Sequence, residues 1–395
     1  MRSLAGMVAG AAVLALSPVA GLAALAGTAM VGAGSGVFTV TGLAVFASVF
    51  HLGLLLCVPR PGAAWGRWLR AALILAVEVA VVWRVADATL TPPPAPAAAP
   101  SPVAGQREWR LPTGSRLAYA RVAPKRVTRP EPVVFLSGAS GLADLAADPA
   151  FYRRLAADGH EVYVYDRVGS GRSARLPDPA AYGLGRDVAD LEQVRQAIGA
   201  RRLTLVARGE GARLAAAYLS AHPDEVSRAV LASPADLDRA RAATLLDDGP
   251  PTPRMLAVHT LLRVEPAAAH AFAGDAELDA RTVGAAVCAA GTPPRATPPP
   301  ARVEGGYARL VERPSPPGMR EGLARVTAPV LVVKGACDGE SWSAAMGVRR
   351  AIPGAGLVYA EGRGAYLATL RAFLAGRAVP PYEGATPPPG YRGPW

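Results

Sequence analysis

A strand–turn–helix pattern near the middle of the chain is the segment best suited to chemistry. Residues 203–207 form an apolar run that predicts a buried strand, and the small residues of 211–220 predict a helix. A turn of this kind with the pattern G-x-S-x-G presents a nucleophilic serine. Here the five positions are Ala207, Arg208, Gly209, Glu210 and Gly211. The turn is therefore predicted, but a glycine stands where the serine would be.

Glycine at this position has a physical logic of its own. The central residue of such a turn is held at a positive φ, which costs a non-glycine residue about 1–3 kcal/mol. Gly209 removes that strain together with the reacting oxygen. We expect its neighbours Arg208 and Glu210 to form a solvated ion pair at the pocket floor, with the Glu210 side chain pointing away from where a serine would point.

Strands and helices alternate around this turn. Apolar runs predict strands over 108–111, 116–122, 132–136, 160–165, 203–207, 226–232, 329–334 and 356–360. Helices are predicted over 149–158, 187–198, 211–220 and 366–374. This alternation predicts an α/β fold with a doubly wound, mostly parallel sheet over residues 107–378. It is interrupted by a proline-rich insertion at about 233–326, and the Pro/Gly-rich tail, 379–395, is predicted to be disordered.

The N-terminal region, residues 1–90, is strongly apolar. No Asp, Glu, Lys or Arg occurs between Ser3 and Pro59. That stretch is too long for one bilayer crossing of about 20 residues and long enough for two. We expect spans near Leu4–Thr28 and Val37–Cys57.

A third apolar segment, Ala71–Leu90, contains Glu78 and Arg84. It either spans with those charges facing other helices or lies at the interface, and its hydropathy favours a span. Arg2 precedes the first span, and the loop between the second and third spans contains Arg60, Arg67 and Arg70. By the positive-inside rule the N-terminus is cytoplasmic and the chain emerges outside after the third span. If the first span were a cleaved signal peptide, the large domain would still lie outside. Residues 91–106 form a semi-rigid Pro/Ala linker.

Composition narrows the partners. The 395 residues carry a formal net charge of +11, nearly all from arginine. This reflects either a basic surface for anionic headgroups or wall polymers, or an arginine-rich composition alone. No dense basic run with interleaved aromatic residues marks a nucleic-acid site, so we expect no nucleic-acid partner. Membrane lipids are the expected partners, through the N-terminal helices. Cys288 and Cys337 either form one disulfide or stay unpaired and buried, whereas Cys57 lies in a predicted span.

Several short motifs in the large domain together resemble those of the α/β-hydrolase superfamily. Residues 137–141, SGASG, stand where its proline iminopeptidase-like branch has H-G-G-P-G. Residues 165–173, YDRVGSGRS, are close to that branch's Y-D-Q-R-G-x-G-x-S. The resemblance covers about residues 107–376. It implies an α/β-hydrolase fold in which the insertion at 233–326 forms a cap.

The resemblance also assigns positions to catalytic residues. Gly335–Asp338 fits the pattern G-x-x-D, which makes Asp338 the retained acid. The base of the family follows the last strand in the pattern G-x-G-H, and here the histidine position is Ala365. Gly209 takes the nucleophile position. The backbone amides that would bind an oxyanion are those of Gly138, Ala139 and Glu210. No cofactor and no metal site are implied.

Other residues would have to replace the missing groups from displaced positions. The substitute nucleophiles are Ser137, Ser140, Cys337 and Glu210. The histidines are His51 in a predicted span, His160 at the far edge of the sheet, His222 at the far end of the turn helix, and His259 and His270 in the cap. In relatives the cap overhangs the pocket, so the last two are the candidate bases.

We therefore expect a membrane-anchored protein of α/β-hydrolase fold whose domain faces the extracytoplasmic side and which has lost serine-hydrolase activity. Its remaining role would be to bind a small peptide or acyl ligand, or a partner protein. Two alternatives stay open. One is an active peptidase-like or esterase-like hydrolase with a displaced nucleophile and base, and the other is a structural membrane component with a collapsed pocket.

Overall fold

The computed structural model describes residues 2–93, 103–138, 145, 147–178, 181–238, 252–282, 315–336 and 339–394. The chain divides into two compact units. The helical unit comprises Met1–Ala95 and Thr244–Glu277, and the sheet unit comprises Pro96–Ala243 and Leu278–Trp395. Part of the segment predicted as a cap thus groups with the N-terminal helices. Each unit is described by itself below.

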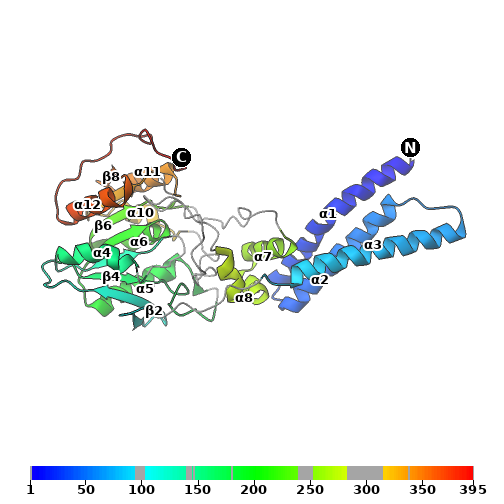
Figure 1. Ribbon diagram of the computed structural model, residues 1–395, viewed down its shortest axis with the longest axis horizontal. Helices are drawn as coiled ribbons and strands as arrows, with labels where there is room; N and C mark the ends of the chain where they lie inside the picture. Colours follow the sequence, from blue (N-terminus) through cyan, green and yellow to red (C-terminus); the bar gives the residue numbers. More distant parts are fainter. Residues whose placement is uncertain are drawn as a thin grey trace. The chain divides into compact units, whose positions relative to one another are not determined.

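The sheet unit is built on one eight-stranded sheet in the order β1-β2-β4-β3-β5-β6-β7-β8 (Figure 1). β1 and β2 form an antiparallel hairpin at one edge, β2 pairs antiparallel with β4, and the remaining pairs are parallel. The strands are β1 (Arg107–Arg110), β2 (Arg116–Val122), β3 (Val133–Leu136), β4 (Val162–Tyr165), β5 (Leu203–Arg208), β6 (Val226–Ala232), β7 (Val330–Lys334) and β8 (Gly356–Tyr359). The predicted α/β fold and mostly parallel sheet are confirmed.

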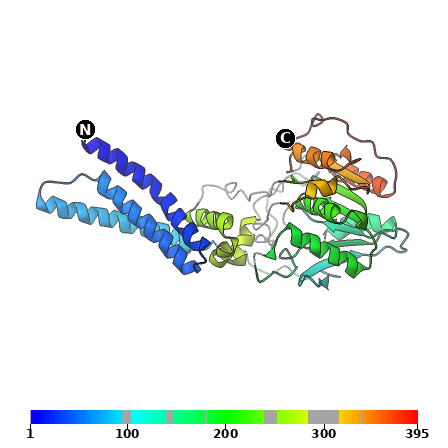
Figure 2. The ribbon, with the colours of Figure 1, turned by 180° about the vertical axis from the view of Figure 1, so that it is seen from behind.

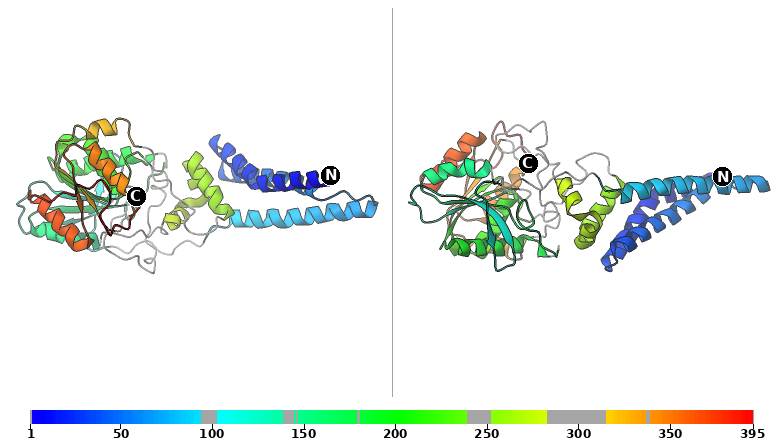
Figure 3. Two further views of the ribbon diagram at one scale, coloured as in Figure 1. Left: turned by 90° about the horizontal axis from the view of Figure 1, so that it is seen from above. Right: turned by 60° about the horizontal axis from the view of Figure 1, so that its bottom comes forward.

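Helices cover both faces of this sheet, and Figure 3 shows the two layers. α4 (Ala147–Ala157) and α12 (Gly362–Leu374) lie on one face, where Leu155 and Leu370 pack against Val133, Val164 and Val206. α5 (Leu184–Ile198) and α6 (Glu210–Ala221) lie on the other face. Because both faces are covered, the central strands are buried along nearly their whole length and read as continuous apolar runs. The unit also contains η2 (Pro223–Glu225), α10 (Met319–Leu323) and α11 (Trp342–Ala351).

The C-terminal tail is packed, so the prediction that it is disordered was wrong. The Trp342 ring, on α11, lies 5.5 Å from the ring of Tyr382 and 5.4 Å from that of Tyr391. Its Nε1–H donates to the carbonyl of Ala385 at 3.1 Å. The Pro/Gly-rich composition gave no sign of this, because the contacts depend on aromatic residues that meet only in the folded chain.

The helical unit contains α1 (Arg2–Met30), α2 (Ser35–Cys57), α3 (Ala64–Leu90), α7 (Pro253–Val264) and the first part of α8 (Pro266–Thr282). α1 and α2 run side by side (Figure 2). They approach closely at Gly21 and Gly42, where a Cβ on either residue would lie 3.0 Å from the carbonyl oxygen of the other. Small residues at the contact are typical of helix pairs in membranes, where close van der Waals packing holds apolar helices together.

Among the described residues, two stretches are long and apolar enough to cross a membrane: Ala5–Met30 in α1 and Ser35–Cys57 in α2. They correspond to the first two predicted spans. α3 is long enough but not apolar enough to be counted with them, because it carries the charged residues Glu78, Arg84 and Asp87. Its membrane crossing therefore stays a prediction.

A polar network ties α5 to α6. The Glu192 carboxylate accepts hydrogen bonds from Arg195 at 2.6 Å, from Gln196 at 2.7 Å and from the Tyr218 hydroxyl on α6 at 2.8 Å. Burial opposes ionisation of Glu192, but these hydrogen bonds prevail and lower its pKa from 4.5 to about 2. Because the folded-state pKa lies below the unfolded value, the network stabilises the protein above pH 4.5 and is lost as the pH falls toward 2.

We expect Glu192→Gln to lower the free energy of unfolding by about 1–3 kcal/mol near pH 7, because it removes the charge of a carboxylate that accepts hydrogen bonds from three side chains. The difference from the wild type should shrink below pH 4.5 and vanish near pH 2. Denaturant unfolding from pH 7 to pH 2 measures it, with Glu361→Gln at an exposed position as the control. A difference independent of pH would contradict the assignment.

Candidate functional site

β5 and α6 are joined by a single residue, Gly209, with φ 55° and ψ −124°. Its N–H donates to the carbonyl of Ala232 at the end of β6 at 3.0 Å. Its carbonyl accepts from the amide of Ala212 in the first turn of α6 at 3.0 Å. These bonds fix a sharp turn at the carboxyl edge of the parallel strands, where ligands bind in open α/β sheets. We call this strand–turn–helix segment, residues 203–221, the elbow.

The first turn of α6 lies directly against the end of β3. A Cβ at Gly211 would lie 2.3 Å from the carbonyl oxygens of both Leu136 and Ser137. Those oxygens belong to backbone that the sheet holds in place, so they cannot move aside for a side chain. Position 211 therefore requires glycine, and the close approach sets where α6 begins.

A family model described as "alpha/beta hydrolase fold" matches residues 131–265, which include β3, the elbow and β6. The sheet unit thus has the α/β-hydrolase fold. Proline iminopeptidase from Heyndrickxia coagulans is 33% identical over 103 residues, which are 26% of this chain and 35% of that protein. Proline iminopeptidase from Lactobacillus helveticus is 28% identical over 129 residues, 32% of this chain and 43% of that protein. The chain thus matches less than half the length of these relatives.

Solved structures of the same fold are also similar over the larger part of the chain. Epoxide hydrolase A from Mycobacterium thermoresistibile shares 19% identity with a TM-score of 0.48, covering 70% of this chain and 99% of that one. Proline iminopeptidase from Mycobacterium smegmatis shares 22% identity with a TM-score of 0.46, covering 68% and 95%.

Two of the three predicted oxyanion amides lie at the elbow. Glu210 is the first residue of α6, and amides in the first turn of a helix have no acceptor within the helix. Gly138 follows β3, and a Cβ there would lie 3.7 Å from the carbonyl oxygen of Arg208. The third, Ala139, lies outside the described residues. The structure thus brings Gly138, Gly209 and Glu210 to one place.

The Glu210 side chain is buried, so the expected solvated pair with Arg208 was wrong. Glu210 is 2% exposed, and none of the described residues donates a hydrogen bond to its carboxylate. Its ionic partner is the fully buried Arg213, one helical turn along, with 3.6 Å between Nη1 and Oε2. Arg213 also donates to the Ser315 hydroxyl at 3.0 Å. Arg208, at the end of β5, is exposed instead. Helical geometry explains the partner, because residues three apart share one face of a helix.

The predicted base position holds no group that could accept a proton. Ala365 lies in the first turn of α12 and is exposed. The phenol of the next residue, Tyr366, lies near that of Tyr152 on α4. Burial raises the pKa of both phenols, so they stay protonated near neutral pH and serve as a packing contact.

The predicted acid, Asp338, lies outside the described residues, as do Ser140, Cys288 and Cys337. The residues around Asp338 are held from both sides. Lys334 at the end of β7 donates to the Glu340 carbonyl at 2.6 Å, and the Arg392 amide of the tail donates to the Ala336 carbonyl at 2.8 Å. The tail thus contacts Ala336, two residues after the end of β7, which the sequence did not reveal. No set of three potential metal ligands occurs in the described part of the chain.

The five histidines, considered as substitute bases, lie at different places in the two units. His160 lies before β4, at the amino edge of the sheet, where burial lowers its pKa. His222 ends α6 and stacks beside Tyr218, with 4.8 Å between the rings. His259 and His270 lie on α7 and α8 of the helical unit, where His270 pairs with Asp275 at 2.9 Å. His51 on α2 pairs with Glu78 of α3 at 2.7 Å.

The motif YDRVGSGRS forms a tightly bonded loop. The Asp166 carboxylate accepts from the Arg172 amide at 2.9 Å. The Ser173 hydroxyl donates to the Asp166 carbonyl at 2.6 Å and accepts from the Ala118 amide of β2 at 2.9 Å. This most specific part of the resemblance therefore supports the edge of the sheet.

We expect Gly211→Ala to destabilise the sheet unit by about 3 kcal/mol or more, because its methyl group would overlap two backbone carbonyls. Gly185→Ala on α5 is the matched control, since a Cβ there meets nothing within 4 Å. That variant should gain about 0.5–1 kcal/mol from helix propensity. Thermal unfolding of both proteins measures the contrast, and equal stabilities would contradict the close approach.

Proposed function

We propose that this is a membrane-anchored α/β-hydrolase-fold protein that binds a small peptide or acyl ligand at the elbow without hydrolysing it. The observation that carries this proposal is the identity of the elbow's central residue. A serine hydrolase needs an oxygen at this point and a base to take its proton. Gly209 and Ala365 supply neither, within an elbow whose backbone geometry is intact.

The remaining elbow supports binding. The amides of Gly138 and Glu210 flank Gly209, and the N-terminus of α6 carries a partial positive charge. Such amides suit the carbonyl or carboxylate oxygen of a peptide or acyl compound. Without a nucleophile, the oxygen would be bound in its ground state and released unchanged.

Of the substitute nucleophiles, Ser137 and Glu210 are among the described residues and lie at the elbow, and Ser137 is the one with a hydroxyl group. Its carbonyl lies against Gly211, and its hydroxyl is buried without a hydrogen bond to any described residue. A serine becomes nucleophilic when an adjacent base accepts its proton. No described base does so for Ser137, which favours ligand binding over hydrolysis by a displaced nucleophile.

The helical unit supports membrane anchoring. α1 and α2 expose large apolar side chains, including Leu16, Val19 and Val40, which bilayer lipids would cover. The 2.7 Å contact between the His51 ring and the Glu78 carboxylate joins α2 to α3, as ionisable residues in membranes pair with one another. This pairing supports α3 as a third span, and with the arginines at Arg2 and in the α2–α3 loop it supports an extracytoplasmic sheet unit.

The proposal predicts that a fluorophosphonate probe leaves the full-length protein in detergent unlabelled. We expect labelling and hydrolysis of acyl esters at least ~10-fold above the wild type in the double variant Gly209→Ser, Ala365→His, which restores the nucleophile and base. Gly209→Ser alone is the control without a base. Covalent labelling of the wild type that Ser137→Ala abolishes would instead establish the displaced-nucleophile hydrolase.

A further inference from the structure

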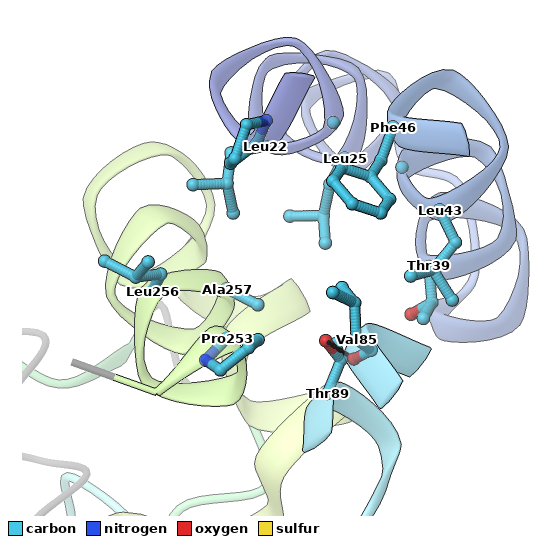
Figure 4. A pocket seen from close by; sticks show the side chains of 13 residues that line it. Leu22, Leu25, Thr39, Leu43, Phe46, Val85, Thr89, Pro253, Leu256 and Ala257 are labelled. Carbon is cyan, nitrogen blue, oxygen red and sulfur yellow. Dashed lines mark hydrogen bonds between the residues drawn. The ribbon is translucent and has the colours of Figure 1, made fainter. Parts of the chain in front are cut away.

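The helical unit contains an apolar cavity of about 250 Å³ (Figure 4). Four helices line it. Leu25 comes from α1, Phe46 from α2, Val85 from α3 and Ala257 from α7, and their side chains point toward one central space. The residues belong to the helical unit alone, so this site is separate from the hydrolase elbow.

The cavity wall offers no polar group to a ligand. Its two hydroxyls belong to Thr39 and Thr89, and each donates to a carbonyl of its own helix, at 2.6 and 2.7 Å. Pro18 lacks the amide that would bond the Leu14 carbonyl, but the Ser17 hydroxyl donates to that carbonyl at 2.7 Å. Since these polar groups are satisfied internally, the part of a ligand that lies here must be apolar.

The size of the cavity suits a hydrocarbon segment. Protein interiors rarely contain voids much larger than a water molecule. An apolar cavity of about 150 Å³ engineered in another protein stays dry and binds benzene. A cavity of about 250 Å³ with the same kind of wall accommodates several methylene groups of an alkyl chain.

Specific contacts hold α7, the fourth helix of the cavity wall, against α3. The Arg254 side chain on α7 is buried and pairs with Glu277 at 2.6 Å. It also donates to the Thr89 carbonyl at 2.7 Å and lies over the ring of Phe272, 4.6 Å from its centroid. A guanidinium at the C-terminus of α3 satisfies carbonyls that the helix leaves without donors. The cavity is therefore built by specific contacts between α7 and α3.

The surroundings indicate the source of the ligand. α1 and α2 are the helices apolar enough to cross a bilayer, and the cavity lies at their connected ends, near residues 18–25 and 39–46. In the proposed orientation these ends lie in the outer half of the membrane. Lipid chains are then the apolar molecules at highest concentration next to the cavity.

We propose that this cavity binds one alkyl chain of a membrane lipid, held between α1, α2, α3 and α7. The proposal rests on the membrane anchoring proposed above and does not depend on the chemistry of the elbow. The proposal also assigns a role to the segment between β6 and β7, because its helix α7 contributes Pro253, Leu256 and Ala257 to the cavity wall.

Native mass spectrometry of the full-length protein, released from bilayer nanodiscs containing phosphatidylglycerol, phosphatidylethanolamine and oleic acid, tests the proposal. We expect one bound lipid per chain, and its mass distinguishes a phospholipid from a free fatty acid. Recovery of the protein in the nanodisc fraction tests the anchoring separately. Failure there refutes the anchoring, whereas insertion without a bound lipid refutes the cavity proposal.

Cavity-filling variants locate the lipid. Ala257→Trp and Leu256→Trp should each lower lipid occupancy at least ~10-fold, because an indole ring fills the space that the chain would take. Leu16→Trp on the exposed side of α1 is the matched control and should retain the lipid. Leu256→Trp provides the test if Ala257→Trp does not fold, since Leu256 is only partly buried. Equal occupancy in folded cavity variants and the control would overturn the proposal.

Discussion

The close approach of α6 to the end of β3 is the constraint on which the site depends. The first turn of α6 lies so near the carbonyls of Leu136 and Ser137 that residue 211 has no room for a Cβ. The helix begins one residue earlier, at Glu210, and Gly209 alone, with a positive φ, joins it to β5. The amides of Glu210 and Gly138 lie beside that turn as a consequence. The geometry of the elbow thus follows from backbone packing and does not need a reactive side chain.

The same packing accounts for the burial of polar groups around the elbow. Glu210 and Arg213 lie on one face of α6, and both are buried. Burying charges is unfavourable unless they are paired, and removing one partner of such a pair costs about 3–5 kcal/mol. The pair therefore belongs to the structural support of the elbow. On the preceding helix, α5, Glu192 accepts a hydrogen bond from the Tyr218 hydroxyl and thereby ties α5 to α6.

The sequence was sufficient to predict the sheet and the turn. Apolar runs such as 133–136 and 203–207 are continuous because both faces of the sheet are covered, and this burial makes strands easy to recognise. Three features were missed because they depend on contacts between distant residues. Glu210 is buried beside Arg213, which donates to Ser315, and the tail packs against Trp342. α7 joins the N-terminal helices through Arg254. Composition and periodicity describe local preference and carry no information on such pairings.

The elbow keeps a positive-φ backbone conformation at Gly209, which would strain any other residue. The free energy of unfolding of Gly209→Ala tests this most directly, with Gly347→Ala on α11 as the control at an unstrained helical position. With φ at 55° and ψ at −124°, alanine at 209 should lower that free energy by about 1–3 kcal/mol. The control should be unchanged or slightly more stable. A Gly209→Ala protein as stable as the wild type would show that the residue does not hold the backbone of a hydrolase elbow.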